Sequence, residues 1–101
     1  MKTSLFVLAT LFAATSALAE TPAELAQKKT CMACHQIDKK VVGPAFKEVA
    51  AKYAKDKDAV NKLVASITKG GTGKWGTGMM PPGMASEAEA KILAQWILTQ
   101  K

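Results

Sequence analysis

The sequence predicts an all-α fold with four helices in one domain. Apolar residues recur at helical spacing along most of the chain, and no run alternates apolar and polar residues for long enough to indicate a strand. Capping motifs and helix-ending glycines divide the periodic part into four segments. The length of 101 residues allows one domain and disfavours two.

The N-terminal segment has the order of a secretory signal. Lys2 gives the start a positive charge, an uncharged apolar stretch follows over residues 5–14, and small residues precede a cleavage point after Ala19. We therefore expect residues 1–19 to be a cleaved signal peptide and residues 20–101 to be the mature domain. A buried or membrane-anchoring helix is the alternative, which the short apolar stretch disfavours.

Capping boxes mark the starts of the first and last expected helices. In the first, Thr21 and Glu24 flank a proline at the first helical position. This helix is expected to run from Pro22 to about Thr30. In the last, Ser86 begins the same motif, S-E-A-E, and the helix continues to the C-terminus. The inward stripe expected for the last helix consists of Ala88, Ile92, Leu93, Trp96 and Ile97.

Apolar periodicity defines the two helices between them. After the Gly-Pro pair at 43–44, apolar residues at i, i+3, i+4 and i+7 predict a helix over residues 46–54. The same spacing follows the candidate caps Asp56 and Asp58 and predicts a third helix that ends at the Gly-Gly pair 70–71.

The charge balance disfavours nucleic acid as a partner. The chain has 14 lysines and no arginine, and its net charge is +6, or +5 once Lys2 is removed. Without arginine it lacks the side chain that contacts phosphate through two hydrogen bonds. Lysine suits the steering of a transient partner, so we expect acidic docking faces on partner proteins. A surface kept soluble by excess charge is the alternative. No stable membrane insertion is expected.

Residues 31–35 carry the chemistry of the chain. They read C-M-A-C-H, the C-x-x-C-H pattern to which a c-type haem is attached. The spacing of Cys31 and Cys34 lets each thiol add across one vinyl group of the porphyrin, and His35 then lies beneath the ring with a nitrogen toward iron. Attachment of this kind occurs outside the cytoplasm, in agreement with export. The motif predicts one covalently bound haem c.

Other interpretations of the two cysteines each lack a part. A thioredoxin-like dithiol requires a βαβ setting. A structural zinc site requires four ligands, and the chain has two Cys and one His. A plain disulfide suits an exported protein but leaves the position of the single histidine unexplained.

The second iron ligand is expected to be a methionine. No second histidine exists, exposed lysine prefers water, and a thioether suits haem iron and raises its reduction potential. Met32 lies in the attachment turn and cannot reach the opposite face, which leaves Met79, Met80 and Met84. We favour Met80, because the two prolines that follow it push it toward extended geometry and stiffen the chain. The other two then pack in the core.

The glycine-rich stretch 70–85 is expected to lie against the haem. It holds six of the seven glycines and three of the five methionines, and long loops in compact domains are usually functional. Glycines allow a chain to approach a porphyrin closely. Trp75 is expected to contact the haem and a propionate, with an ordinary core aromatic as the alternative.

The haem-attachment motif is part of a longer sequence pattern made of four stretches. They read C-M-A-C-H-Q, V-V-G-P-A-F-K-E-V-A-A-K-Y-A, G-K-W-G-T-G-M-M-P-P and A-Q-W-I-L-T-Q-K. Together they closely resemble the small bacterial class I cytochromes c of the cytochrome c-551 (c-552) type, over nearly all of residues 20–101. The resemblance implies a small cytochrome c fold wrapped around one haem and a periplasmic electron-shuttling role. It also implies thioether bonds at Cys31 and Cys34, and His35 and Met80 as axial ligands.

The resemblance implies two further contacts and shows two differences. It implies that the carbonyl of Pro44 accepts the other ring N–H of His35, and that Trp75 contacts a propionate. Gly83 stands where relatives commonly have asparagine, and Ser66 stands where a basic residue often faces a propionate. Both differences leave the expected iron ligands in place, but they bear on the reduction potential of the haem and on the geometry with which methionine binds the iron.

With both axial positions filled by side chains, iron has no site for a substrate, which argues against an enzyme. The expected function is one-electron transfer between respiratory redox partners by a monomer. A haem enzyme or gas sensor with a labile methionine, and a haem-free dithiol module, are the alternatives. Lysines expected near the crevice to guide acidic partners are Lys28, Lys29, Lys39, Lys40 and Lys74.

Overall fold

The computed structural model describes residues 20–101, and these residues are mainly helical. The predicted signal peptide, residues 1–19, lies outside the described part of the chain. The helices are α1 (Pro22–Lys28), the short 3-10 helix η1 (Cys31–Ala33), α2 (Phe46–Lys52), α3 (Ala59–Lys69) and α4 (Glu87–Ile97). The expected all-α fold with four α-helices is confirmed.

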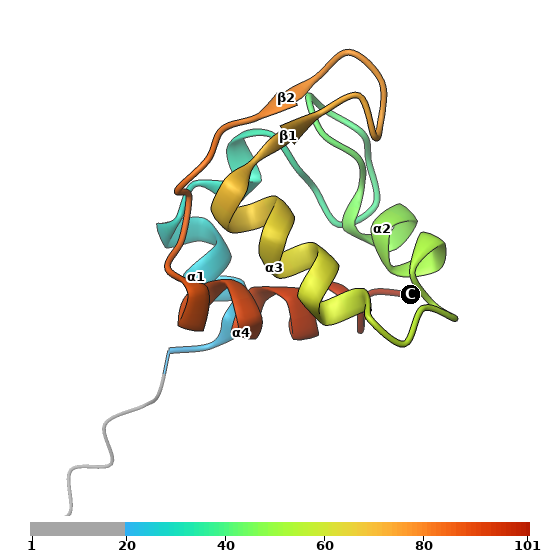
Figure 1. Cartoon of the computed structure of the whole chain (residues 1–101). Coiled ribbons are helices and arrows are strands. Elements are labelled where there is room, and N and C mark those ends of the chain that lie inside the picture. Colours follow the sequence, from blue (N-terminus) through green and yellow to red (C-terminus); the bar gives the residue numbers. More distant parts are fainter. Residues whose placement is uncertain (1–19) are drawn as a thin grey trace, which may run out of the picture.

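A small hairpin is present where the sequence predicts no strand. Strand β1 (Gly71–Thr72) pairs antiparallel with β2 (Met79–Met80), so that Gly71 lies opposite Met80. Strands of two residues are too short to show alternation in a sequence, which is why the pattern does not indicate them. Figure 1 shows the hairpin above α3, on the side of the molecule away from α4.

The starts of α1 and α4 follow the capping signals, whereas the Asp58 side chain makes no capping hydrogen bond at the start of α3. At α4, the Ser86 N–H donates to Glu89 Oε1 at 3.0 Å and the Glu89 N–H donates to Ser86 Oγ at 3.2 Å. At α1, the Glu24 N–H donates to Thr21 Oγ1 at 3.2 Å. The first helix ends earlier than its predicted end at Thr30, because Thr30 adopts a left-handed φ of 59°. That conformation turns the chain into η1.

Helix α4 joins two apolar clusters into one core. It packs against α3, α1 and α2, and Figure 1 shows it crossing below α3 toward α1. The first cluster is built on α2, α3 and α4 from Phe46, Val49, Tyr53, Ala59, Leu63, Ala94 and Ile97. The second lies on α1, α3, α4 and the segment before α4, and consists of Leu25, Ala26, Ile67, Ala85, Ala90 and Leu93.

The inward face of α4 differs from the predicted stripe. Ala88 is exposed and Ile92 is 47% exposed, whereas the buried residues are Ala90, Leu93, Ala94 and Ile97. These four fall at i, i+3, i+4 and i+7, so the helical period was right but the chosen face was rotated. Small alanines on this face allow α4 to approach its neighbours closely.

The start of α4 predicts a pH dependence of stability. Hydrogen bonds from Ser86 and an ion pair with Lys29, 3.1 Å away, lower the pKa of Glu89 from 4.5 to about 2. Its charge therefore stabilises the folded state above about pH 4.5, and this contribution is lost as the pH falls toward 2. Glu89→Gln should lower the free energy of unfolding at pH 7, with the difference from wild type shrinking below pH 4.5.

Urea denaturation at several pH values checks this prediction. Glutamine keeps a side-chain oxygen for the Ser86 N–H, so the variant isolates the charge. As a control, Thr21→Ala removes the uncharged cap of α1 and should cost about 1 kcal/mol at both pH 7 and pH 2.5. A Glu89→Gln effect of equal size at pH 7 and pH 2.5 would contradict the account.

Candidate functional site

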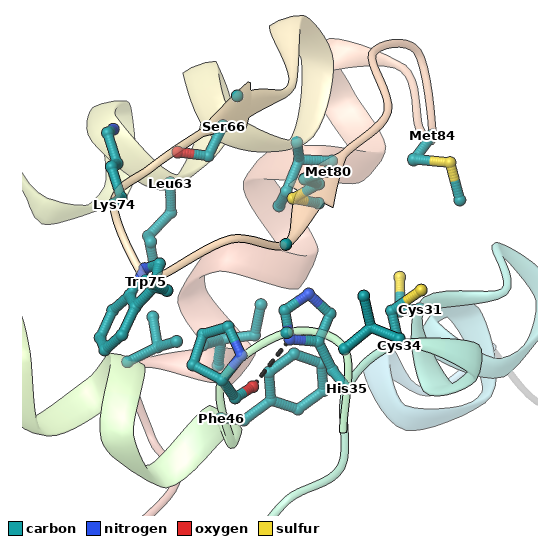
Figure 2. A pocket seen from close by; sticks show the side chains of 18 of the residues that line it. Cys31, Cys34, His35, Phe46, Leu63, Ser66, Lys74, Trp75, Met80 and Met84 are labelled. Carbon is teal, nitrogen blue, oxygen red and sulfur yellow. Dashed lines mark hydrogen bonds between the residues drawn. The ribbon is translucent and has the colours of Figure 1, made fainter. Parts of the chain in front are cut away.

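A large apolar cleft lies between the helices and the β1–β2 hairpin. Its empty space is about 1210 Å³, counted together with the open solvent at its mouth. The predicted site residues Cys31, Cys34, His35 and Met80 all line it. Figure 2 shows the two cysteines at one end, His35 below and Met80 above.

The turn after α1 places the two cysteines at the cleft. The His35 and Cys34 N–H groups both donate to the Cys31 carbonyl, at 2.9 and 3.2 Å. This tight turn holds both thiols at the same end of the cleft (Figure 2). Both are free and partly buried, and burial raises the pKa of the Cys31 thiol above 9.0. Met32 packs into both apolar clusters from within this turn.

His35 is oriented by a backbone acceptor and an aromatic ring. Its Nδ1 lies 2.8 Å from the Pro44 carbonyl oxygen, and because a carbonyl only accepts, Nδ1 carries the proton. The lone pair of Nε2 is then available, and Figure 2 shows this nitrogen directed into the cleft toward Met80. Phe46 stacks on the imidazole with ring centroids 5.1 Å apart. The contact with Pro44 that the resemblance implies is present.

Gly43 is a supporting residue that the sequence did not single out. A Cβ at this position would lie 2.3 Å from His35 Cε1, well inside contact distance. The Gly43 N–H also donates to the Cys34 carbonyl at 2.7 Å. The backbone of residue 43 therefore packs directly on the imidazole. The Gly-Pro pair at 43–44 was the only hint in the sequence of a special backbone at this position. Only the fold shows that Gly43 packs against the His35 side chain.

Gly43→Ala is expected to destabilise the haem-loaded protein by about 1–3 kcal/mol, because the imidazole must move away from an added methyl group. Denaturation followed by absorbance measures this change. The wild-type protein is the reference, and equal stability of Gly43→Ala and wild type would contradict this role for Gly43.

The methionines of the glycine-rich stretch differ in placement. Met79 is 64% exposed, whereas Met80 is partly buried and packs against the second apolar cluster. Successive residues of a strand point to opposite faces, in agreement with the different exposure of these two methionines. Met79 and Met84 also line the cleft, but Met79 is mostly exposed and Figure 2 shows the Met84 side chain near the cysteine end, whereas Met80 lies over His35. The arrangement favours Met80.

Trp75 and Ser66 line the cleft at the end away from the cysteines. The Nζ of Lys52 lies 4.4 Å from the centroid of a Trp75 ring, in a cation–π contact that sequence reasoning missed. The Ser66 hydroxyl donates to the Lys62 carbonyl one turn earlier in α3. Lys52 and Trp75 lie on different elements, so no local pattern could have paired them.

Two glycines of residues 70–85 lie very close to the backbone of other segments. A Cβ at Gly78 would lie 2.7 Å from the Val42 carbonyl oxygen, and one at Gly70 would lie 2.4 Å from the Met80 carbonyl oxygen. These approaches join the hairpin to the chain after His35 and to the end of α3. Close contact with backbone is thus one reason for glycine in this stretch.

The predicted lysines do not all remain available for a partner. Lys29 pairs with Glu89 at 3.1 Å and serves the packing of α1 on α4. Lys28, Lys39, Lys40 and Lys74 are exposed, and Lys74 lines the cleft. Among residues 20–101, no helix is long and apolar enough to cross a membrane.

The donor set and the shape of the cleft fit a haem. A flat apolar ring needs apolar walls, two thiols at one edge and a ligand above and below, and the lining supplies each of these. Within residues 20–101, His, Cys, Asp and Glu do not gather in groups of three or more, as a structural zinc site of such residues would require.

Comparison with known proteins identifies the class. Residues 19–101 match the Cytochrome c family profile, and the chain belongs to this family. It is a small monohaem c-type electron carrier with one covalently attached haem c, and it is not an enzyme.

Its relatives are cytochromes c-551 and c-552. The cytochrome c-551 of Azotobacter vinelandii is 55% identical over 82 residues, which are 81% of this chain and 100% of that protein. The cytochrome c-551 of Pseudomonas aeruginosa is 48% identical over 98 residues, covering 97% of this chain and 93% of that protein. The crystal structure of wild-type Nitrosomonas europaea cytochrome c552 has a TM-score of 0.75 at 54% identity, covering 78% of this chain and 99% of that one.

Proposed function

We propose that this protein is a periplasmic electron shuttle whose haem is attached at Cys31 and Cys34 and ligated by His35 and Met80. The observation that carries the proposal is the placement of His35 and Met80 on opposite sides of one apolar cleft, with both thiols at its end. The haem supplies the one-electron chemistry. Residues 1–19 act as the export signal, and residues 20–101 form the cytochrome c domain.

The side chains suit transfer with little rearrangement. The hydrogen bond from His35 to the Pro44 carbonyl fixes the imidazole, and the same bond raises its basicity toward iron. Two prolines follow Met80 and stiffen the backbone beside the thioether. Fixed side chains on both sides keep the same ligands in both oxidation states, and they leave no position for a substrate.

The surface around the cleft suits brief contact with an acidic protein. Val41 and Val42 are 48% and 52% exposed, and Met79 is exposed beside them at the cleft. Lys40 and Lys74 lie exposed on the same loops. Exposed apolar side chains provide a small contact area, while the positive charge steers encounter. We propose transient, electrostatically steered complexes with respiratory redox partners by a monomer.

Purification of the protein from the periplasm tests the proposal. The expected mass is that of residues 20–101 plus one haem, and the absorption spectrum should change with oxidation state. Reduced protein should not bind carbon monoxide at neutral pH, because Met80 occupies the sixth position. A colourless protein, or ready carbon monoxide binding, would overturn the proposal.

The choice of partner is tested separately by ionic strength. Electron exchange with an acidic redox protein should slow as salt rises through the range where the Debye length falls from about 30 Å to about 8 Å. Exchange with a basic redox protein should instead become faster. An acidic partner whose rate does not depend on salt would contradict the proposed steering.

A further inference from the structure

Backbone atoms at the end of α3 lie close to the backbone of the segment that bears Met80. We call this segment, residues 79–83, the methionine arm. Gly70, which ends α3, has φ 68° and ψ −170°, a combination that is essentially restricted to glycine. It turns the chain from the helix into β1, directly beneath the methionine arm.

Gly70 lies too close to the arm to carry a side chain. A Cβ there would lie 2.4 Å from the Met80 carbonyl oxygen, 2.8 Å from Pro82 N and 2.9 Å from Pro81 C. All three are backbone atoms, so they cannot rotate away as the tip of a side chain could. The whole arm would have to move by about 1 Å to restore ordinary contact.

Two further contacts hold the arm on the same surface. Gly71 pairs with Met80 in the β1–β2 hairpin. At the far end of the arm, the Gly83 N–H donates to the Thr68 carbonyl in the last turn of α3, at 2.8 Å. The arm is thus held on both sides of Pro81-Pro82, by β1 before the prolines and by α3 after them, with Gly70 packed between these two contacts.

We propose that Gly70 is a positioning residue for the thioether of Met80. The inference rests on the proposed function, in which Met80 binds iron. Because the end of α3 supports the Met80 backbone directly, the absence of a side chain at residue 70 sets how far the sulfur extends into the cleft. The strength of the iron–sulfur bond then depends on Gly70, which approaches the backbone of the methionine arm rather than the side chain of either iron ligand.

Two haem-loaded variants and the wild-type protein test this role. Gly70→Ala adds both backbone strain and contact with the arm. Gly76→Ala adds only the strain, since Gly76 has φ 110°, does not line the cleft, and a Cβ there meets only the tip of Lys40 at 4.0 Å. The readouts are the sulfur-to-iron charge-transfer band of the oxidised protein, the reduction potential, and imidazole affinity.

Gly70→Ala should weaken or abolish the charge-transfer band, lower the potential, and raise the affinity for imidazole on the order of tenfold, as expected when overpacking opposes ligand binding. Gly76→Ala should keep wild-type values of all three, even where it melts at a lower temperature. If Gly70→Ala instead matches Gly76→Ala in band, potential and imidazole affinity, the positioning role is overturned while the ligand assignment stands.

Met80→Ala separates this inference from the proposed function. If that variant keeps the charge-transfer band, Met80 is not the ligand and the proposed function fails. Should oxidised Gly70→Ala not fold, the reduced form is used, because methionine ligation raises the potential and so binds reduced iron more strongly. Reduced Gly70→Ala should then bind carbon monoxide on the order of tenfold more tightly than Gly76→Ala; equal affinities would overturn the inference.

Discussion

Cys31→Ala combined with Cys34→Ala is expected to leave the chain largely unfolded. Both apolar clusters border the cleft, and its walls include Phe46, Leu63 and Leu93 from three different helices. A chain of about 80 residues buries only about 60–65% of its unfolded surface. Covalent haem contributes the apolar surface that these side chains need, so its loss removes the centre of the core.

Circular dichroism and thermal melting measure this effect. The double variant should lose most helical signal and show no cooperative transition. Ala33→Ser is the matched control, because Ala33 is exposed in the same 3-10 turn, and it should fold and bind haem as wild type does. A haem-free double variant that melts cooperatively would show that the polypeptide forms its core without the cofactor.

Met80→Ala is expected to abolish the sulfur-to-iron charge-transfer band of the oxidised protein. Its reduction potential should also fall by a substantial part of the roughly 0.8 V over which axial ligands tune haem proteins. Met80 is partly buried and lies over His35 in Figure 2, so its truncation removes a ligand as well as packing. Reduced Met80→Ala should bind carbon monoxide at neutral pH.

Met79→Ala is the matched control for this change. Met79 is 64% exposed and neighbours Met80 on the same strand, so the variant shortens a methionine without reaching the iron. It should keep the band and the potential. The reverse outcome, with the band lost in Met79→Ala and kept in Met80→Ala, would move the ligand by one residue.

Local signals predicted much of the fold. Apolar spacing and the capping motifs at Thr21 and Ser86 located the helices, because both depend on residues within two turns of each other. The end of α1 was missed because Thr30 adopts a left-handed conformation that its residue type rarely takes. The α4 face was misplaced because Ile92 is more apolar than the alanines that tertiary packing actually buries.

The site was predictable where chemistry lies in a short motif. Cys31, Cys34 and His35 follow from one five-residue pattern, and the choice of Met80 follows from the prolines after it. The supports at Gly43 and Gly70 were not predictable, because each depends on atoms that are distant in sequence or on another element. A glycine in a loop indicates that the backbone can adopt unusual conformations, but only the fold shows which atoms a side chain at that position would contact.

X-ray diffraction at the iron absorption edge, from crystals of the haem-loaded protein, tests the central claim most directly. The account predicts one iron between His35 Nε2 and the Met80 sulfur, with both cysteine sulfurs bonded to the porphyrin edge. Iron bound by the sulfur of Met79 or Met84, or by water in place of a side chain, would contradict it.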